Sequence, residues 1–252
     1  MIQTLATLPI DVTAIKLAPP GLDEMYDHVI GVTMSDFAHC HDVAGTKLNG
    51  SIAARVWSDA NNHTRELCLV RTFVNESEDS WDMLNDFTLK QWPYINIHGA
   101  LGNGEAHVDI TDGDKGAAAS HDRILNGARR FLDYLHRFKA LTKSASGATA
   151  QSYKKLFYAK SRGELDTLKR DVPSTHLAKP SQIPDENQYP CCAGGTGLGH
   201  VRTSSPVESF NAKCLEMQRS VDFAHWIQLA VLCIADRHHR GAHAEATRSR
   251  CF

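Results

Sequence analysis

Apolar residues follow two kinds of spacing along this chain, and these predict strands in its first part and mainly helices later. Short apolar runs at residues 29–34, 51–59 and 64–74 are rich in β-branched residues, which is typical of strands. A-N-N-H at residues 60–63 separates the second and third runs with turn-forming asparagines, so these two runs predict a hairpin. The first run reads as a buried central strand that ends at Asp36. A carboxylate there would open onto solvent from a rigid sheet, although the same residue could simply begin the next turn.

A helix and a further strand are predicted next. S-E-D-S at residues 77–80 begins the helix, because its acidic first turn suits the positive end of the helix dipole, and W-P at residues 92–93 ends it. Residues 107–111 form a short apolar run that leads directly into Asp112. A second strand is therefore expected to end on a carboxylate.

The rest of the chain is predicted to be mostly helical. Composition predicts one helix from residue 117 to about 141, and apolar spacing predicts an amphipathic helix or pair over 151–172. Residues 173–199 contain four prolines and four glycines, which indicates a long loop. S-P-V-E at residues 205–208 begins the last helix, with Ser as N-cap, Pro at the first position and Glu208 at the capping-box position.

Length and cysteine content narrow the class of protein. The 252 residues are enough for one substantial domain, and no apolar run is long enough to cross a bilayer. The N-terminus lacks the basic start of a signal peptide. None of the seven cysteines forms a Cys-x-x-Cys pair, so we expect neither a zinc ribbon nor a disulfide framework, and we infer a reducing, intracellular compartment.

The small net charge of −2 hides an uneven distribution. Residues 1–120 carry 7 basic and 17 acidic residues, whereas residues 121–180 carry 13 basic and 5 acidic ones. The basic segment suggests a surface that faces a polyanion, and the acidic half suggests clustered carboxylates. A solvated helical surface would explain the basic segment equally well.

The order of strand, hairpin, helix, strand and helices is similar to that of an RNase H-like α/β core. This resemblance implies a mixed five-stranded sheet with flanking helices, interrupted here by an all-helical insertion. In that fold three acids hold two divalent metal ions for in-line attack at phosphorus. Carboxylate oxygens suit Mg²⁺ or Mn²⁺.

Local motifs make the resemblance more specific. D-F-A-H at residues 36–39 resembles the D-x-x-H of Mutator-like element (MULE) transposases, and T-D-G-D-K-G at 111–116 resembles their S-D-R-x-K-G. G-H-V-R-T-S-S-P-V-E-S-F-N at 199–211 is similar to their G-H-x-T-S-N-x-x-E-S-x-N. Three further matches, to a D-x-N-N turn, an E-x-E-x-S-W helix start and a helical insertion, lie at residues 58–63, 74–81 and 158–166. The motifs occur in the family's order from about residue 29 to 234.

The resemblance assigns roles to particular residues. Asp36, Asp112 and Glu208 match the family's catalytic, metal-binding acids, and His39 and His200 are candidates to support them. It implies DDE-type DNA cleavage and strand transfer with Mg²⁺ or Mn²⁺, in the nucleus. Element ends and target DNA would be the partners, a homodimer is a candidate assembly, and no membrane is involved.

The resemblance also divides the chain. It implies a connector at residues 1–27, the first part of the core at 28–120, and a helical insertion with a loop at 121–198. The core returns at 199–236, and a basic, histidine-rich tail follows at 237–252.

Several alternatives stay open. Glu208 could serve only as a helix cap, Asp114 could replace Asp112 as a ligand, and the histidines could be packing or surface residues. The Arg of S-D-R is Gly113 here, and the Asn before the Glu motif is Ser205. With the family's DNA-binding and zinc segments also unmatched, an inactive, truncated or domesticated derivative that binds DNA or protein is the alternative function. A generic RNase H-like nuclease is the third hypothesis, and the G-H…E-S-x-N motif argues against it.

Overall fold

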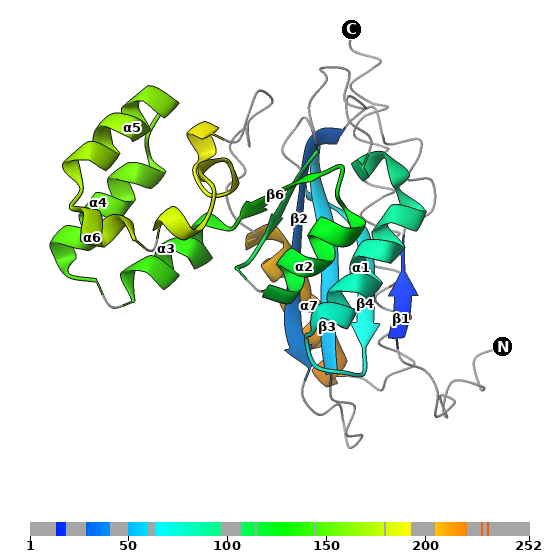
Figure 1. The fold of residues 1–252 in the computed structure, drawn as a ribbon. Coiled ribbons are helices and arrows are strands. Elements are labelled where there is room, and N and C mark those ends of the chain that lie inside the picture. The colour runs from blue at the N-terminus through cyan, green and yellow to red at the C-terminus, as the bar shows by residue number, and fades with distance from the viewer. Residues whose placement is uncertain are drawn as a thin grey trace, which may run out of the picture.

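A six-stranded mixed sheet organises the computed structural model of this chain (Figure 1). The structure describes residues 14–18, 29–40, 50–59, 64–96, 107–113, 115–143, 145–178, 180–192, 205–220, 228 and 231. The strands are β1 (Ala14–Leu17), β2 (Val29–Cys40), β3 (Gly50–Asp59), β4 (Thr64–Thr72), β5 (Val108–Thr111) and β6 (Arg129–Leu132). They are ordered β1-β4-β3-β2-β5-β6. The neighbours from β1 to β2 are antiparallel, and β5 and β6 continue the sheet in parallel with β2.

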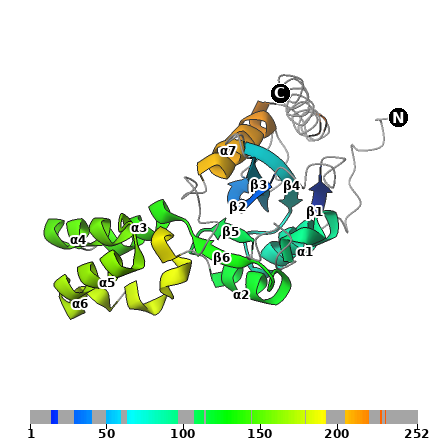
Figure 2. The same cartoon turned by 90° about the horizontal axis from the view of Figure 1, so that it is seen from above.

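Helices cover both faces of this sheet. The α-helices are α1 (Glu78–Gln91), α2 (Lys115–Ile124), α3 (Tyr134–Thr142), α4 (Gly147–Phe157), α5 (Arg162–Asp171), α6 (Ser174–Leu177) and α7 (Ser205–Ser220). Four short 3-10 helices are η2 (Pro93–Asn96), η3 (Pro180–Gln182), η4 (Asp185–Asn187) and η5 (Pro190–Cys192). Helices α1 and α2 pack together on one face, and α7 lies on the other, against β2 and β3 (Figure 2). The chain is therefore of the α/β class.

Side chains along the central strands point alternately to the two faces of the sheet, so an apolar core forms on each face. Val32, Met34 and Ile110 point to the α7 side, where they meet Val207 and Phe210 of the helix. The opposite face of β2, β3 and β4 packs against α1 and α2 through a second apolar cluster that includes Trp81 and Leu84. Burial on both faces explains why the run at residues 29–34 is almost continuously apolar.

Several predicted elements are confirmed. The strands β3 and β4 form an antiparallel hairpin, and α4 and α5 are the predicted pair of helices. Helix α1 begins after Ser77, whose Oγ accepts a hydrogen bond from the backbone N–H of Ser80. The last helix begins at Ser205 as predicted. Its predicted continuation beyond residue 220 lies outside the described residues apart from positions 228 and 231.

The end of the first strand was predicted wrongly. Strand β2 does not end at Asp36 but continues to Cys40, paired with β3 from Phe37↔Ala53 to Cys40↔Gly50. The strand was expected to end where the apolar run meets the Asp36 carboxylate, but the pairing with β3 keeps the following residues extended. Asp36 is therefore held within the strand, which fixes its backbone more firmly than a loop would.

The predictions of five strands and of one helix from residue 117 to 141 were also wrong. Strand β1 lies in the segment assigned as a connector, and β6 interrupts the predicted helix. Helix α2 stops before Gly127, where a Cβ would collide with the backbone of Asn96. The chain then pairs with β5, beginning at the hydrogen bond from Arg129 N to His107 O (2.6 Å). R-R-F-L has little strand preference of its own, so tertiary pairing decides its conformation.

Helices α3 to α6 form a group with its own core beside the sheet (Figures 1 and 2). Its buried residues include Leu141, Tyr153, Phe157, Leu165 and Tyr189. The segment predicted as a long loop from residue 173 contains α6 and three 3-10 helices up to residue 192, and it contributes Tyr189 to this core. Among the helices that the structure describes, none is long and apolar enough to span a membrane.

Candidate active site

The register of two parallel strands brings Asp36 and Asp112 together. Strand β2 pairs with β5 through Met34↔Ile110, and two residues further along each chain lie Asp36 and Asp112. Neighbouring strands are about 4.8 Å apart, and residues two apart share a face. Both aspartates therefore lie on the α7 side of the sheet, as Met34 and Ile110 do.

Helix α7 carries Glu208 over the same face. Asn211, one turn after Glu208, donates a hydrogen bond from Nδ2 to the backbone oxygen of Asp36 at 3.1 Å. Residues three apart lie on the same side of a helix, so this bond orients the first turn of α7 toward Asp36. Asn211 is 1% exposed, and Val207 and Phe210 are buried in the core beneath the helix. The third acid is thus positioned by packing and by a bond to the strand of the first acid.

A histidine that the sequence analysis did not select completes the group. His136 of α3 lies with Nε2 3.4 Å from Oε1 of Glu208. Its backbone N–H donates to Oδ1 of the buried N-cap residue Asp133 at 2.7 Å, which fixes the start of α3. His136 was hidden because residues 117–141 were read as one helix, in which it would have been a surface residue. A new helix start at Asp133 was the signal that could have revealed it.

The electrostatics of Asp36 show that these groups act on one another. Burial, followed by the negative charges of Asp112 and Glu208, raises the pKa of Asp36 to about 7, while the backbone N–H of Phe37 and His136 oppose the shift. A carboxylate surrounded in this way binds a proton or a cation more readily than an isolated one. The site is therefore a concentration of negative charge at the edge of a rigid sheet.

This raised pKa predicts an unusual dependence of stability on pH. The folded chain binds the Asp36 proton more tightly than the unfolded chain does, so this group favours folding at low pH and ceases to do so as pH rises from about 4 to about 7. Asp36→Asn is expected to stabilise the protein at pH 8 and to stabilise it clearly less at pH 5. The upper limit for a shift of this size is about 4 kcal/mol, and partial exposure lowers it. Urea unfolding at both pH values measures the difference.

The matched control is Asp86→Asn, which removes an exposed carboxylate of α1. It should shift stability equally little at both pH values. The bond from Asn211 survives in the Asp36 variant because it goes to a backbone oxygen. Equal stability of the Asp36 variant and the unmodified chain at pH 8 would show that neither burial nor the neighbouring acids raise the pKa of Asp36.

A hydrogen bond to its backbone oxygen holds Asp112 in place. Arg130 of β6 donates from NH2 to the Asp112 backbone oxygen at 2.8 Å and from Nε to Oγ1 of Thr111 at 2.8 Å. On the single helix predicted from residue 117 to about 141, Arg130 would have made no such contacts. The adjacent Gly113 has open space around its Cβ position, so an arginine at this point of the family motif would fit without a collision.

Of the other predicted site residues, the structure describes only His39, and it does not join this group. His39 is exposed on β2, and because it is three positions from Asp36 in an unbroken register, its side chain lies on the opposite face of the sheet. His200 and Asp114 lie outside the described residues. Within the described part of the chain, no three His, Cys, Asp or Glu side chains stand close enough together to hold a metal ion as they are.

A buried charged network lies on the opposite face, beneath α1 and α2. Arg55 and Asp109 are both 0% exposed and form an ion pair at 2.8 Å. Thr33 and Ser35 of β2 also donate to Asp109, at 2.8 and 3.0 Å, and Arg55 donates to Asn85 of α1 at 2.8 Å. Burial disfavours the charge of Asp109, but Arg55 and the hydroxyl donors outweigh it and keep its pKa below the ordinary value. The network joins β2, β3 and β5 at the level of the candidate site.

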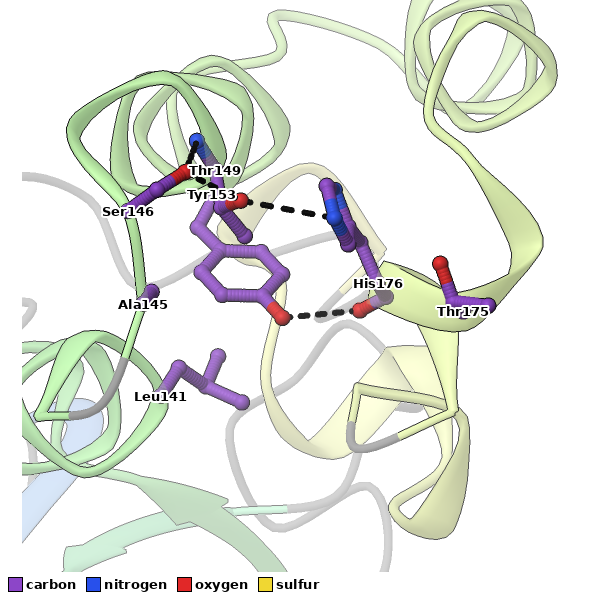
Figure 3. A pocket seen from close by; sticks show the side chains of 7 residues that line it. All are labelled: Leu141, Ala145, Ser146, Thr149, Tyr153, Thr175 and His176. Atoms are coloured by element: carbon purple, nitrogen blue, oxygen red, sulfur yellow. Dashed lines mark hydrogen bonds between the residues drawn. The ribbon is translucent and has the colours of Figure 1, made fainter.

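A separate cavity of about 340 Å³ lies within the helical group (Figure 3). Its polar groups mostly bond to one another: Tyr153 donates from its hydroxyl to the His176 backbone oxygen at 2.8 Å, and Thr149 Oγ1 lies 3.4 Å from His176 Nε2. Ser146 caps α4 at its rim by accepting the backbone N–H of Thr149. No carboxylate lines this cavity, and its hydroxyls serve the packing of α4 against α6.

Comparisons with known proteins do not identify the chain: no protein-family model matches it, and no curated protein is significantly similar to it. The chemistry of the site must therefore be argued from its own groups. Three carboxylates on one face of a sheet, with a histidine against one of them, can bind cations and can accept or position protons.

Proposed function

We propose that this chain is the catalytic domain of a Mutator-like DDE transposase, which cleaves and joins DNA strands by phosphoryl transfer. The observation that carries the proposal is the β2–β5 register, since it sets Asp36 beside Asp112 under the helix that carries Glu208. These are the three residues that the family motifs select from 29 acidic residues in the chain. The register brings two of them to the face of the sheet that is covered by the helix of the third.

The fold gives further support. A central strand followed by an antiparallel hairpin, a helix and a parallel strand is the order expected of an RNase H-like core, and β1 and β6 extend the sheet at its edges. The helical group follows the second acid and precedes the third, as the family's insertion would. We propose that this group, with its excess of basic residues, is the insertion and that it contacts DNA.

The donor set fits a divalent cation such as Mg²⁺ or Mn²⁺. Asp36, Asp112 and Glu208 supply hard oxygen ligands, and their mutual repulsion, visible in the raised pKa of Asp36, would be relieved by positive charge. As they stand they are not close enough to enclose an ion, so binding requires the side chains to converge. A bound cation would supply activation of the attacking oxygen and stabilisation of the leaving oxygen.

The remaining residues of the site would hold the three acids in position. Asn211 holds α7 on β2, so that Glu208 stays over Asp36 when substrate is bound. Arg130 fixes the backbone at Asp112. His136 orients Glu208 through their contact, and it links the first turn of α3 to the acids. These contacts connect α7 to β2 and to α3 at the candidate site.

Calorimetry with Mg²⁺ and Mn²⁺ tests the proposal. The unmodified chain is expected to bind cation, and Asp36→Asn, Asp112→Asn and Glu208→Gln are each expected to weaken that binding by at least about tenfold while the fold is kept. Because a bound cation favours the ionised form of Asp36, binding at pH 6 should also release protons, which buffers of different ionisation enthalpy detect. Binding unaffected by all three changes would mean that the cation lies elsewhere.

The second candidate is an inactive derivative of the same family that binds DNA or protein. The spacing of the acids in the described structure favours it, because no three potential ligands are close enough for a metal ion. An unmodified chain that binds no cation even with DNA present would support this candidate. A nuclear location and a homodimer remain parts of the proposal that follow from the family alone.

A further inference from the structure

Tyr158 is an exposed aromatic residue at the corner between α4 and α5. Its side chain is 52% exposed, whereas neighbouring Phe157 and Ala159 are buried at 2% and 7%. As the C-cap of α4, its backbone N–H bonds to carbonyls of the last helical turn, including those of Lys154 and Lys155. The corner is therefore a fixed backbone feature that places an aromatic ring at the surface.

The ring also contacts another aromatic ring. It meets the Tyr134 ring edge-on, with centroids 5.7 Å apart and planes at 83°, and Tyr134 itself packs on Phe138 and Phe157. An exposed tyrosine braced in this way loses little side-chain freedom when a flat group stacks on it. Such rigid aromatic residues are effective contact points in binding surfaces.

Four cations lie near Tyr158 along the chain. Lys154 and Lys155 lie one turn before Tyr158 on α4, and Lys160 and Arg162 follow it. All four are exposed, and no acidic residue occurs from position 154 to 163. The nearest carboxylate in sequence, that of Glu164, accepts the backbone N–H of Lys160 at 2.7 Å and so serves the start of α5. We call Tyr158 and these four cations the basic corner.

The basic corner lies close to the candidate active site. Tyr134, which braces the Tyr158 ring, is the first residue of α3, and His136 in the same turn contacts Glu208. Positive charge and an aromatic face are thus arranged next to a negatively charged centre.

We propose that the basic corner binds an unpaired nucleotide of a DNA strand, with its base stacked on Tyr158 and the flanking phosphates on the surrounding cations. An exposed aromatic ring with cations on each side is the arrangement that proteins use for single strands. Bases inside a duplex are already stacked and cannot reach such a ring, so the corner selects distorted or unpaired DNA. The choice of DNA rests on the proposed function, whereas the choice of an unpaired nucleotide rests on the corner itself.

Binding of fluorescently labelled DNA in EDTA tests this inference without any cleavage. The probes are a duplex of about 20 base pairs and the same duplex with a few unpaired thymines in one strand. The chain is expected to prefer the second probe by about 5- to 100-fold, the range for one stacked base. Tyr158→Ala should remove this preference, and Tyr158→Phe, which keeps the ring, should retain it.

Charge variants separate stacking from attraction to phosphates. Replacing Lys154 and Lys155 by Gln should weaken binding of both probes and lower the salt dependence by roughly 0.7 to 0.9 per lost phosphate contact. Lys90→Gln, which removes an exposed cation of α1 beneath the other face of the sheet, is the matched control and should change neither. Tyr158 variants must melt at the temperature of the unmodified chain for the comparison to count.

Different failures are distinguishable. An unchanged preference in Tyr158→Ala, no preference in the unmodified chain, or binding of polyglutamate in place of DNA would each overturn this inference. Preference for the unpaired probe without any metal-dependent cleavage would overturn the proposed activity and leave the basic corner as a nucleic-acid site.

Discussion

Asp36→Asn is expected to reduce metal-dependent DNA strand cleavage by roughly 10³-fold or more, which corresponds to the loss of several kcal/mol of transition-state stabilisation. Asp112→Asn and Glu208→Gln should do the same, because the three carboxylates act on one another and share one face of the sheet. Each substitution keeps the size of the side chain and removes its charge. Nicking of a supercoiled plasmid with Mg²⁺ or Mn²⁺ measures the effect.

Asp86→Asn is again the control, since it removes one exposed carboxylate on the far side of the sheet. It should cleave at the rate of the unmodified chain. The double variant with Asp36 and Asp112 both changed should be no slower than either single variant, because residues that work as a unit are not additive. Cleavage that survives all three single changes would assign it to a contaminating nuclease or to another site.

Asp109→Ala is expected to destabilise the fold by about 3–5 kcal/mol, because it leaves the Arg55 charge buried without its partner. Both side chains are fully buried, and Asp109 also accepts the hydroxyl bonds of Thr33 and Ser35. Domains of this size are usually stable by only about 5–15 kcal/mol, so the loss would be a large share of the total. Urea unfolding followed by circular dichroism measures it.

An exposed ion pair provides the control for this prediction. Arg123 bonds to Glu78 and Asp82 between α2 and α1, with half of its side chain exposed. Arg123→Ala should cost far less than Asp109→Ala, because exposed ion pairs contribute little to stability. Replacing both members of the buried pair, Arg55→Met with Asp109→Leu, should recover much of the stability. A loss in Asp109→Ala no larger than that in Arg123→Ala would show that water reaches the buried pair.

The buried pair and the candidate site respond to pH in opposite directions. The pKa of Asp109 lies below its ordinary value of 3.8, so its contribution to stability is present above pH 4 and is lost only as pH falls through its folded value. The Asp36 group instead favours folding at low pH and loses that effect toward pH 7. The buried pair and the acids of the candidate site lie on opposite faces of one sheet. The buried pair links β3 to β5 and so supports the strand register that brings the acids together.

Most of the elements could be predicted from the sequence because local patterns determine them. The alternation at residues 51–59 and 64–74, the Ser77 cap and the S-P-V-E helix start all specify their conformations within a few residues. The candidate acids Asp36, Asp112 and Glu208 could also be selected from the sequence, because the motifs that contain them can be read directly along the chain. Arg55 and Asp109 are charged residues within apolar strands, and that pattern could have indicated a buried pair.

Only the tertiary structure decided the features that depend on distant contacts. The residues R-R-F-L form β6 because they pair with β5. Strand β2 continues past Asp36 because its residues up to Cys40 pair with β3. His39 was separated from Asp36 by the alternation of that longer strand, and His136 took the place beside Glu208 once the predicted helix was broken. Hydrogen bonds between strands and the packing of α7 on the sheet outweigh local preferences worth tenths of a kcal/mol per residue, and so they determine which side chains meet.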